Sequence, residues 1–362
     1  MSDEATRSDR GAGPQDGLAG QGDLEAGLAG QGDLEAGLAD QGDLDLYARM
    51  SYLRAFEERA DTLYRQGLIH GPAHLGLGHE AIAVGAASVL RTDDYSIGTY
   101  RGHAHALARG APPDAVLAEL LGRQGGICAG KGGSMHITST EHGYYGSYAI
   151  VGAHLPIACG LAWAAKIRRT GQVTACFFGD GATNIGAFHE AVNLAAVWRL
   201  AVVFVCENNW YMEYTPIADV IAVQLPAADR AAAYGLDRIV VDGNDVLAVR
   251  RTVGSAVAAA REGQGPSLIE AQTYRLKGHS VADAGAYRPA EEVARWRDFD
   301  PLLRARKELE QSGTSAAALD EADASARADV LALTERVLAR PAPDPATAWT
   351  DVWADGSGQW RN

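Results

Sequence analysis

Residues 173–215 decide the fold and read VTACFFGDGATNIGAFHEAVNLAAVWRLAVVFVCENNWYMEYT. The run VTACFF is apolar and rich in strand-forming residues, and the glycines in GDG predict a turn directly after it. The run AFHEAVNLAAVW repeats apolar residues at helical spacing, and AVVFVC has the composition of a second buried strand. We therefore predict a strand–helix–strand unit with parallel strands and a right-handed crossover.

One acidic and one amide side chain follow the two strands of this unit. Asp180 comes directly after the first strand, and Asn209 comes after the second. Neighbouring parallel strands end at the same edge of a sheet, where open α/β sheets bind ligands. A carboxylate and an amide oxygen suit Mg²⁺, which completes its octahedron with water and phosphate oxygens, and the flanking glycines allow a diphosphate close to the backbone. Each motif alone is a common turn or loop, but together they predict a metal–diphosphate site.

Composition limits the function classes open to this chain. Its 362 residues are 47% hydrophobic, and its net charge of -14 argues against nucleic acid or an anionic membrane as a partner. The four cysteines show no CxxC spacing, which argues against a zinc site or a disulfide framework. No apolar run is long enough to span a membrane, and the N-terminus lacks a signal or transit pattern. We expect a cytoplasmic protein.

The chain divides into three predicted parts. Residues 1–43 hold a repeat, GLAGQGDLEA at 17–26 and again at 27–36, with too few large apolar residues to form a core, so we expect disorder. Residues 44–325 alternate strand-like and helix-like segments, which predicts an α/β fold, a doubly wound parallel sheet with helices on both faces. Residues 326–362 are expected to form a C-terminal helix and a tail.

Two further observations concern loops and motifs. Residues 125–152 are glycine-rich and aperiodic, which predicts one long loop, and long loops inside compact domains usually serve function. The chain lacks both the P-loop pattern GxxxxGK[ST] and the dinucleotide fingerprint GxGxxG. The missing fingerprint argues against a nicotinamide-dependent oxidoreductase, which stays an alternative.

Further candidate residues follow from their positions. Arg101 comes just after a predicted strand, where an arginine can clamp a phosphate, although a surface ion pair is the competing interpretation. His103 and His105 are two residues apart and cannot face one way on a helix. His279 lies in a loop after a strand, where it could donate to phosphate or handle protons. Three other histidines lack the spacing of a zinc site and are rejected as a metal cluster: His70, His74 and His79.

A wider set of motifs resembles one enzyme family. The family is the alpha subunit of the thiamine-diphosphate-dependent decarboxylating component of 2-oxo acid dehydrogenase complexes. The similarity is carried by HLGLGHEAIAVGAASVLRTDDY, TYRGHAHALARG, GKGGSMHI, IVGAHLPIACG, GDGATNIGAFHEAVNLAAVWRL, VFVCENNWYMEYTP and TYRLKGHS. It covers about residues 45–300 and implies the thiamin-diphosphate-binding fold.

The resemblance implies that the predicted metal–diphosphate site belongs to thiamine diphosphate. Asp180 and Asn209 would hold Mg²⁺, with the backbone oxygen of Tyr211 as a third ligand. Gly181 and Ala182 would lie against the diphosphate. Asp180 and Asn209, which were singled out because each follows a parallel strand, are thus implied to be metal ligands.

The resemblance also implies residues for the rest of the cofactor. Val151 would press the cofactor into its bent shape, and Ala149 would meet the aminopyrimidine through its backbone. His103 would lie near the reacting end, and together with His279 it forms the predicted catalytic pair. A tyrosine, an arginine and a histidine are implied at the phosphates: Tyr100, Arg101 and His279.

The implied activity is oxidative decarboxylation of a 2-oxo acid. Pyruvate is the favoured substrate, and acetoin and branched-chain 2-oxo acids are alternatives. The acyl unit would pass to a lipoyl group on a partner acyltransferase. The family's activating glutamate lies on a beta subunit, so the resemblance implies an α2β2 heterotetramer and a chain that is inactive alone. A non-catalytic scaffold paralogue is the remaining alternative.

Several positions depart from the family pattern. Ile185 stands where relatives usually carry Glu or Gln, residues 147–149 read SYA in place of a pattern nearer GNG, and Trp210 is bulky. These departures concern the size and polarity of the pocket rather than the metal site. Ser280 matches a serine that is phosphorylated in mitochondrial relatives, but the second serine of that loop is missing around residues 286–287. We therefore expect Ser280 to pack or to form hydrogen bonds.

Overall fold

The computed structural model describes residues 42–351 and 353 of the 362-residue chain. The N-terminal repeats, and with them almost all of the segment predicted to be disordered, lie outside the described residues. Along 42–351 and 353, none of the helices has the length and apolar character that crossing a membrane requires.

Six parallel strands form the central sheet. They are β1 (Tyr95–Thr99), β2 (Tyr144–Tyr148), β3 (Thr174–Gly179), β4 (Val202–Asn208), β7 (Ile239–Asp242) and β8 (Ser267–Gln272). Their order is β2-β1-β3-β4-β8-β7, and each neighbouring pair is parallel. A separate antiparallel pair joins β5 (Tyr211–Met212) to β6 (Thr215–Pro216).

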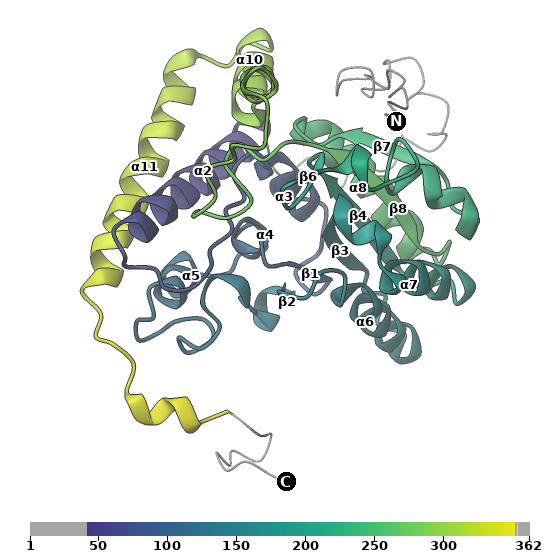
Figure 1. Ribbon diagram of the computed structural model, residues 1–362, viewed down its shortest axis with the longest axis horizontal. Coiled ribbons are helices and arrows are strands. Elements are labelled where there is room, and N and C mark those ends of the chain that lie inside the picture. The colour runs from purple at the N-terminus through teal and green to yellow at the C-terminus, as the bar shows by residue number, and fades with distance from the viewer. Residues whose placement is uncertain (1–41, 352, 354–362) are drawn as a thin grey trace, which may run out of the picture.

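Helices cover both faces of this sheet (Figure 1). The α-helices of the described residues are α2 (Asp43–Arg65), α3 (Glu80–Ala87), α4 (His103–Ala108), α5 (Pro113–Leu120), α6 (His154–Arg168), α7 (Gly186–Val197), α8 (Val246–Arg261), α9 (Ala290–Asp298), α10 (Pro301–Gln311) and α11 (Ala316–Leu338), and α3, α6, α7 and α8 pack on the sheet. Phe178 and Phe204 share a core cluster with α6 and α7, whereas Phe177 and Val203 share another with α3 and α8. Successive strand residues therefore face opposite cores, and the doubly wound class is confirmed.

The predicted strand–helix–strand unit is confirmed. β3 leads through a 3₁₀ turn, η3 (Asp180–Asn184), into α7 and then into β4. The two strands pair in parallel from Thr174 opposite Val202 to Gly179 opposite Glu207. Asp180 therefore leaves the sheet one position beyond Gly179, which places it beside the end of β4.

The prediction of one long loop at residues 125–152 is wrong in part, because β2 lies inside it. β2 reads YYGSY and pairs with β1 at the edge of the sheet. It lacks the apolar run that marks the central strands, since an edge strand has a neighbour on one side only. Two short 3₁₀ turns, η1 (Gly133–Met135) and η2 (Thr140–His142), precede it.

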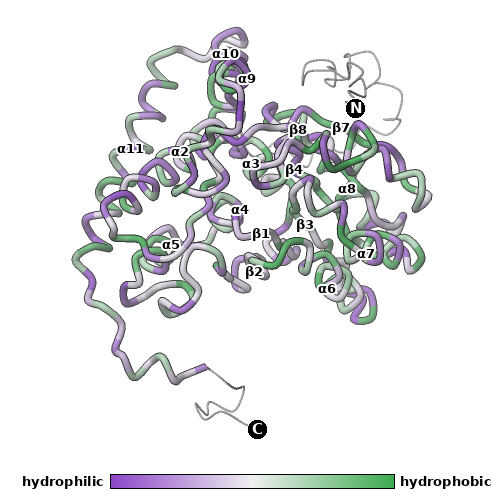
Figure 2. The backbone as a smooth tube through the Cα atoms, in the orientation of Figure 1, coloured by the Kyte–Doolittle hydropathy of each residue, from purple (hydrophilic) through white to green (hydrophobic). Residues whose placement is uncertain are grey.

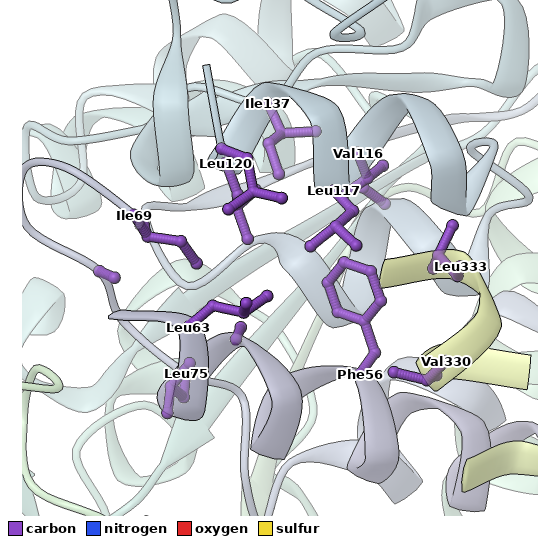
Figure 3. Close-up of a cluster of buried hydrophobic side chains, with 14 of the residues drawn as sticks. Phe56, Leu63, Ile69, Leu75, Val116, Leu117, Leu120, Ile137, Val330 and Leu333 are labelled. Atoms are coloured by element: carbon purple, nitrogen blue, oxygen red, sulfur yellow. The ribbon is translucent and has the colours of Figure 1, made fainter. Parts of the chain in front are cut away.

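The C-terminal helices pack against the first helix of the fold. Phe56 of α2, Leu117 of α5 and Val330 of α11 belong to one buried cluster (Figure 3). Hydrophobic and hydrophilic residues alternate along α11 (Figure 2), as expected for a helix with one buried face. The boundary predicted between residues 325 and 326 falls inside α11, and the division into domains stays a prediction.

Shortening Val330 to alanine should lower the free energy of unfolding by about 2 kcal/mol. Val330 is 2% exposed, so the change removes two methyl groups from the interface between α2 and α11 and leaves a cavity. The matched control is Leu331→Ala on the same helix, where the side chain is 52% exposed and the expected change is within about 0.5 kcal/mol. Urea unfolding followed by circular dichroism measures both, and equal midpoints for the two variants would contradict the packing.

Candidate active site

A cavity opens at the carboxyl edge of the sheet, where β1, β3 and β4 end. Its volume is about 580 Å³. Every residue predicted to bind the cofactor or the metal lines it: Tyr100, Arg101, Ala149, Val151, Asp180, Gly181, Ala182, Asn209, Tyr211 and His279. Segments far apart in the sequence thus converge at the edge where parallel α/β sheets bind ligands.

Asp180 starts η3 directly after β3 and is buried. Its Oδ1 accepts a hydrogen bond from the Gly181 backbone N–H at 2.7 Å, and its carbonyl oxygen accepts one from Thr183 Oγ1 at 2.8 Å. Its Oδ2 is buried and has no hydrogen-bond partner among the described residues. Burial raises the pKa of this carboxyl to about 6. A buried carboxylate oxygen in this state is available to ligate a cation.

The loop after β4 brings Asn209 and Tyr211 to the same cavity. The side-chain oxygen of Asn209 accepts a hydrogen bond from the Tyr211 backbone N–H at 3.3 Å. Trp210, between them, has a φ of +70°, a left-handed conformation that is uncommon for a large side chain. Asn208 stabilises this turn, because its Oδ1 accepts a hydrogen bond from the Trp210 backbone N–H at 3.0 Å.

Glu270 is a buried carboxylate behind this loop, and the sequence analysis did not single it out. Its Oε1 accepts a hydrogen bond from Asn208 Nδ2 at 2.7 Å, and its Oε2 accepts two from the backbone N–H groups of Ala227 and Ala228 at 2.9 Å. Burial raises the pKa of Glu270 to about 7, although these donors oppose the shift. One signal was present: a charged residue in the apolar strand SLIEAQ requires buried partners.

Two arginines and a neutral histidine lie together in the lining of the cavity. Arg101 is buried and donates to the backbone oxygens of Leu75 and His279, so it is not a surface ion pair. Arg275, which the sequence analysis missed, donates to His279 Nδ1 at 2.9 Å and to the Glu213 backbone oxygen at 2.8 Å. Burial and the two guanidinium groups lower the pKa of His279 to about 4. At neutral pH its Nδ1 is an acceptor, which leaves the proton on Nε2 for an anionic ligand.

Ile185, one of the departures from the family pattern, and Met212 supply apolar side chains to the cavity lining. Ile185 lines the cavity and lies so close to Gly152 that a Cβ added there would meet its Cδ1 at 2.1 Å. Met212 lies over Gly181, where an added Cβ would meet the Met212 Cγ at 2.5 Å. The cavity therefore has an apolar wall beside the predicted diphosphate turn, and a side chain at position 181 would require Met212 to move.

Comparison with known proteins gives the family of this chain. Residues 48–346 match the family described as dehydrogenase E1 component. The chain belongs to this family. Its fold, a parallel sheet with helices on both faces and a helical C-terminal part, agrees with that membership.

Several relatives within the E1 family are named for their subunit. The alpha subunit of acetoin:2,6-dichlorophenolindophenol oxidoreductase from Bacillus subtilis is 47% identical over 247 residues, which are 68% of this chain and 74% of the relative. The alpha subunit of the pyruvate dehydrogenase E1 component from Zymomonas mobilis is 43% identical over 310 residues, covering 85% of this chain and 87% of the relative. Its counterpart from Rhizobium meliloti is 39% identical over 308 residues, covering 84% and 88%.

His74 is a cavity residue of this E1 protein that the sequence analysis set aside. Its ring lies 4.4 Å from the Tyr100 ring and 5.0 Å from the His279 ring, measured between centroids. Burial and the nearby Arg101 lower its pKa to about 3, so it is neutral at physiological pH. The described residues contain no group of three or more His, Cys, Asp or Glu side chains placed to hold a metal ion. His79 also lines the cavity.

His103, the other predicted catalytic histidine, does not line this cavity. It is buried, with Nδ1 at 3.0 Å from Glu57 Oε2 and Nε2 at 2.8 Å from Ser134 Oγ. His105, on the same helix, faces another way and bonds through Nε2 to Glu207 Oε1 at 3.0 Å. The two histidines therefore point apart, and a catalytic role for His103 stays a prediction.

Proposed function

We propose that this chain is the alpha subunit of a thiamine-diphosphate-dependent 2-oxo acid dehydrogenase, with pyruvate as the favoured substrate. The observation that carries the proposal is Asp180 Oδ2, which has no hydrogen-bond partner among the described residues and shares its cavity with Asn209, Arg101, Arg275 and His279. A cation would pair with the Asp180 carboxylate, and a diphosphate would pair with both the cation and the two arginines. The named pyruvate dehydrogenase relatives cover more than four fifths of the chain.

The residues fit a magnesium–diphosphate group better than a metal held by protein alone. Asp180 and Asn209 would hold Mg²⁺ with the backbone oxygen of Tyr211, and phosphate oxygens would complete the shell. Bound thiamine diphosphate supplies the electron sink that decarboxylation of a 2-oxo acid requires. The Nε2 proton of His279 would donate to a phosphate, and Arg101 and Arg275 would balance its charge.

The proposal includes a beta subunit and a lipoyl-bearing acyltransferase as partners. Val151, which lines the cavity, and its neighbour Ile150 are 46% and 72% exposed. Ile167 of α6 and Val197 of α7 are 64% and 68% exposed. The exposed apolar pair beside the cavity, Ile150 and Val151, supports a protein interface there. We assign this surface to the beta subunit, which would complete the site beside Val151, and we keep a cytoplasmic location as part of the proposal.

A second candidate substrate rests on the acetoin-type relative. That protein is more identical to this chain than the pyruvate-type relatives, although over a shorter alignment. The apolar wall at Ile185 and Met212 suits an uncharged substrate such as acetoin as well as the methyl group of pyruvate. Branched-chain 2-oxo acids need more room and are the third choice.

The test is reconstitution with the cognate beta subunit. The chain alone should not decarboxylate pyruvate in the presence of thiamine diphosphate and Mg²⁺, whereas the mixed subunits should release carbon dioxide and reduce 2,6-dichlorophenolindophenol. Measurement of kcat/KM for pyruvate, acetoin and a branched-chain 2-oxo acid ranks the substrates. Full decarboxylation by the chain alone would contradict the shared site, and no cofactor-dependent turnover of any of the three would refute the proposed function.

A further inference from the structure

Glu270 connects the two segments that carry the proposed metal ligands. It lies on β8, directly opposite Cys206 of the neighbouring strand β4, and is fully buried. Its two carboxylate oxygens face different parts of the chain. Oε1 meets Asn208, at the end of β4, and Oε2 meets the start of the 3₁₀ helix η5 (Ala228–Tyr234).

The Oε1 side reaches the Asn209 loop through Asn208. Asn208 is fully buried and donates from Nδ2 to Glu270 while its Oδ1 accepts from the Trp210 backbone N–H. This pairing fixes which way the Asn208 amide points. The left-handed turn at Trp210 therefore depends on a hydrogen bond that Glu270 orients, and this turn presents Asn209 and Tyr211 to the cavity.

The Oε2 side reaches Asp180 through η5. Glu270 accepts the backbone N–H groups of Ala227 and Ala228 and so holds the start of η5. From η5, Arg230 donates to the backbone oxygen of Thr183 and to Asn184 Oδ1, the latter at 2.9 Å. Both acceptors belong to η3, which Asp180 starts.

We infer that Glu270 is a positioning residue for the proposed Mg²⁺ site, holding the Asp180 and Asn209 segments at a fixed separation. Glu270 does not line the cavity, and its side chain acts through Asn208 on one side and η5 on the other. Metal affinity is sensitive to such supporting contacts, because ligands that must reorganise bind more weakly. This inference rests on the proposed function and deepens it.

The test uses a reversal of the Glu270–Asn208 pair. Glu270→Gln leaves an amide facing the Asn208 amide, and Asn208→Asp leaves a carboxylate facing a carboxylate. In the double variant, the new amide at position 270 can donate its N–H to the new carboxylate at position 208, and its oxygen can accept from Ala227 and Ala228. The carboxylate at position 208 can still accept from the Trp210 backbone N–H. The double variant therefore restores every hydrogen bond and the number of carboxylates.

The readout is the Mg²⁺ concentration that half-saturates thiamine diphosphate binding to the assembled subunits, measured by titration calorimetry. Each single variant should raise this Mg²⁺ concentration about tenfold, which corresponds to about 1.4 kcal/mol of binding free energy. In the double variant, the concentration should lie within about threefold of the wild-type value. Glu321→Gln, at an exposed position of α11, is the matched control and should change nothing. Circular dichroism establishes that every variant is folded at the assay temperature.

Charge alone predicts a different pattern, which separates the explanations. If charge alone determined Mg²⁺ affinity, the added carboxylate of Asn208→Asp would tighten Mg²⁺ binding. If positioning determines it, the same variant should bind Mg²⁺ more weakly. A double variant as weak as the singles, or a Glu270→Gln variant that loses thermal stability without losing Mg²⁺ affinity, would overturn the inference alone. A wild-type complex that binds no Mg²⁺ with thiamine diphosphate would overturn the proposed function and this inference together.

Discussion

Replacing Asp180 with asparagine should lower the activity of the assembled enzyme by about a thousandfold. The carboxylate supplies a buried oxygen, Oδ2, that forms no hydrogen bond with any described residue. Asparagine keeps the size of the side chain but removes the negative charge that balances Mg²⁺. The affinity for thiamine diphosphate should fall with it, because the diphosphate then faces Arg101 and Arg275 without a bridging cation on its other side.

Steady-state turnover and calorimetric titration of the cofactor measure the two losses. Asp298→Asn is the matched control, because Asp298 is exposed at the end of α9. That control should retain wild-type turnover and cofactor affinity. An Asp180→Asn enzyme with wild-type Mg²⁺ dependence would show that the cation binds elsewhere in the molecule.

Replacing Glu119 with alanine should lower the free energy of unfolding by about 3 kcal/mol, which makes it the largest stability effect that we expect. The Glu119 side chain extends from α5 into the glycine-rich segment and is 1% exposed. Its Oε2 accepts from the backbone N–H groups of Cys128 and Gly130 at 2.8 Å, and its Oε1 accepts from those of Gly132 and Gly133 at 2.7 and 3.0 Å. Alanine leaves these four N–H groups without their acceptor.

Urea unfolding measures the loss, and tryptic cleavage after Lys131 reports local opening of the segment. Glu119→Gln should lie between alanine and wild type, because one of its two terminal atoms still accepts hydrogen bonds. Glu141→Gln, at an exposed position of the same region, is the control and should stay within about 0.5 kcal/mol of wild type. If Glu119→Ala unfolds at the wild-type midpoint and resists trypsin, the carboxylate does not hold this segment.

The glycine-rich segment shows why part of the fold escaped prediction. Its aperiodic composition correctly marked an irregular stretch, but its partner, Glu119, lies outside it on α5, and nothing in the local sequence links the two. The edge strand β2 was missed for a related reason. Its residues YYGSY form a strand because β1 offers a parallel neighbour, and no apolar pattern of their own predicts one.

The cavity shows the same division between local and long-range information. Asp180 and Asn209 were predictable because each follows a strong strand signal, and parallel strands end at one edge. Arg275 and His74 were not, because each depends on a partner that is distant in sequence: Arg275 donates to the Glu213 backbone oxygen, and the His74 ring packs against Tyr100. His103 is the opposite case, since the family resemblance singled it out and the fold directs it toward Glu57.

The sequence by itself determined the sheet class, the strand–helix–strand unit, and the convergence of Asp180 and Asn209 at one edge. These follow from hydrophobic periodicity and turn residues, which act over a few positions and repeat along the chain. The places of Arg101 and His279 at the same site were implied by the family resemblance. Only the tertiary structure decided that Asp180 Oδ2 has no hydrogen-bond partner among the described residues, that His279 is neutral beside Arg275, and that Glu270 joins the two ligand segments. Desolvation and hydrogen-bond pairing depend on atoms brought together from distant segments, and no local pattern specifies them.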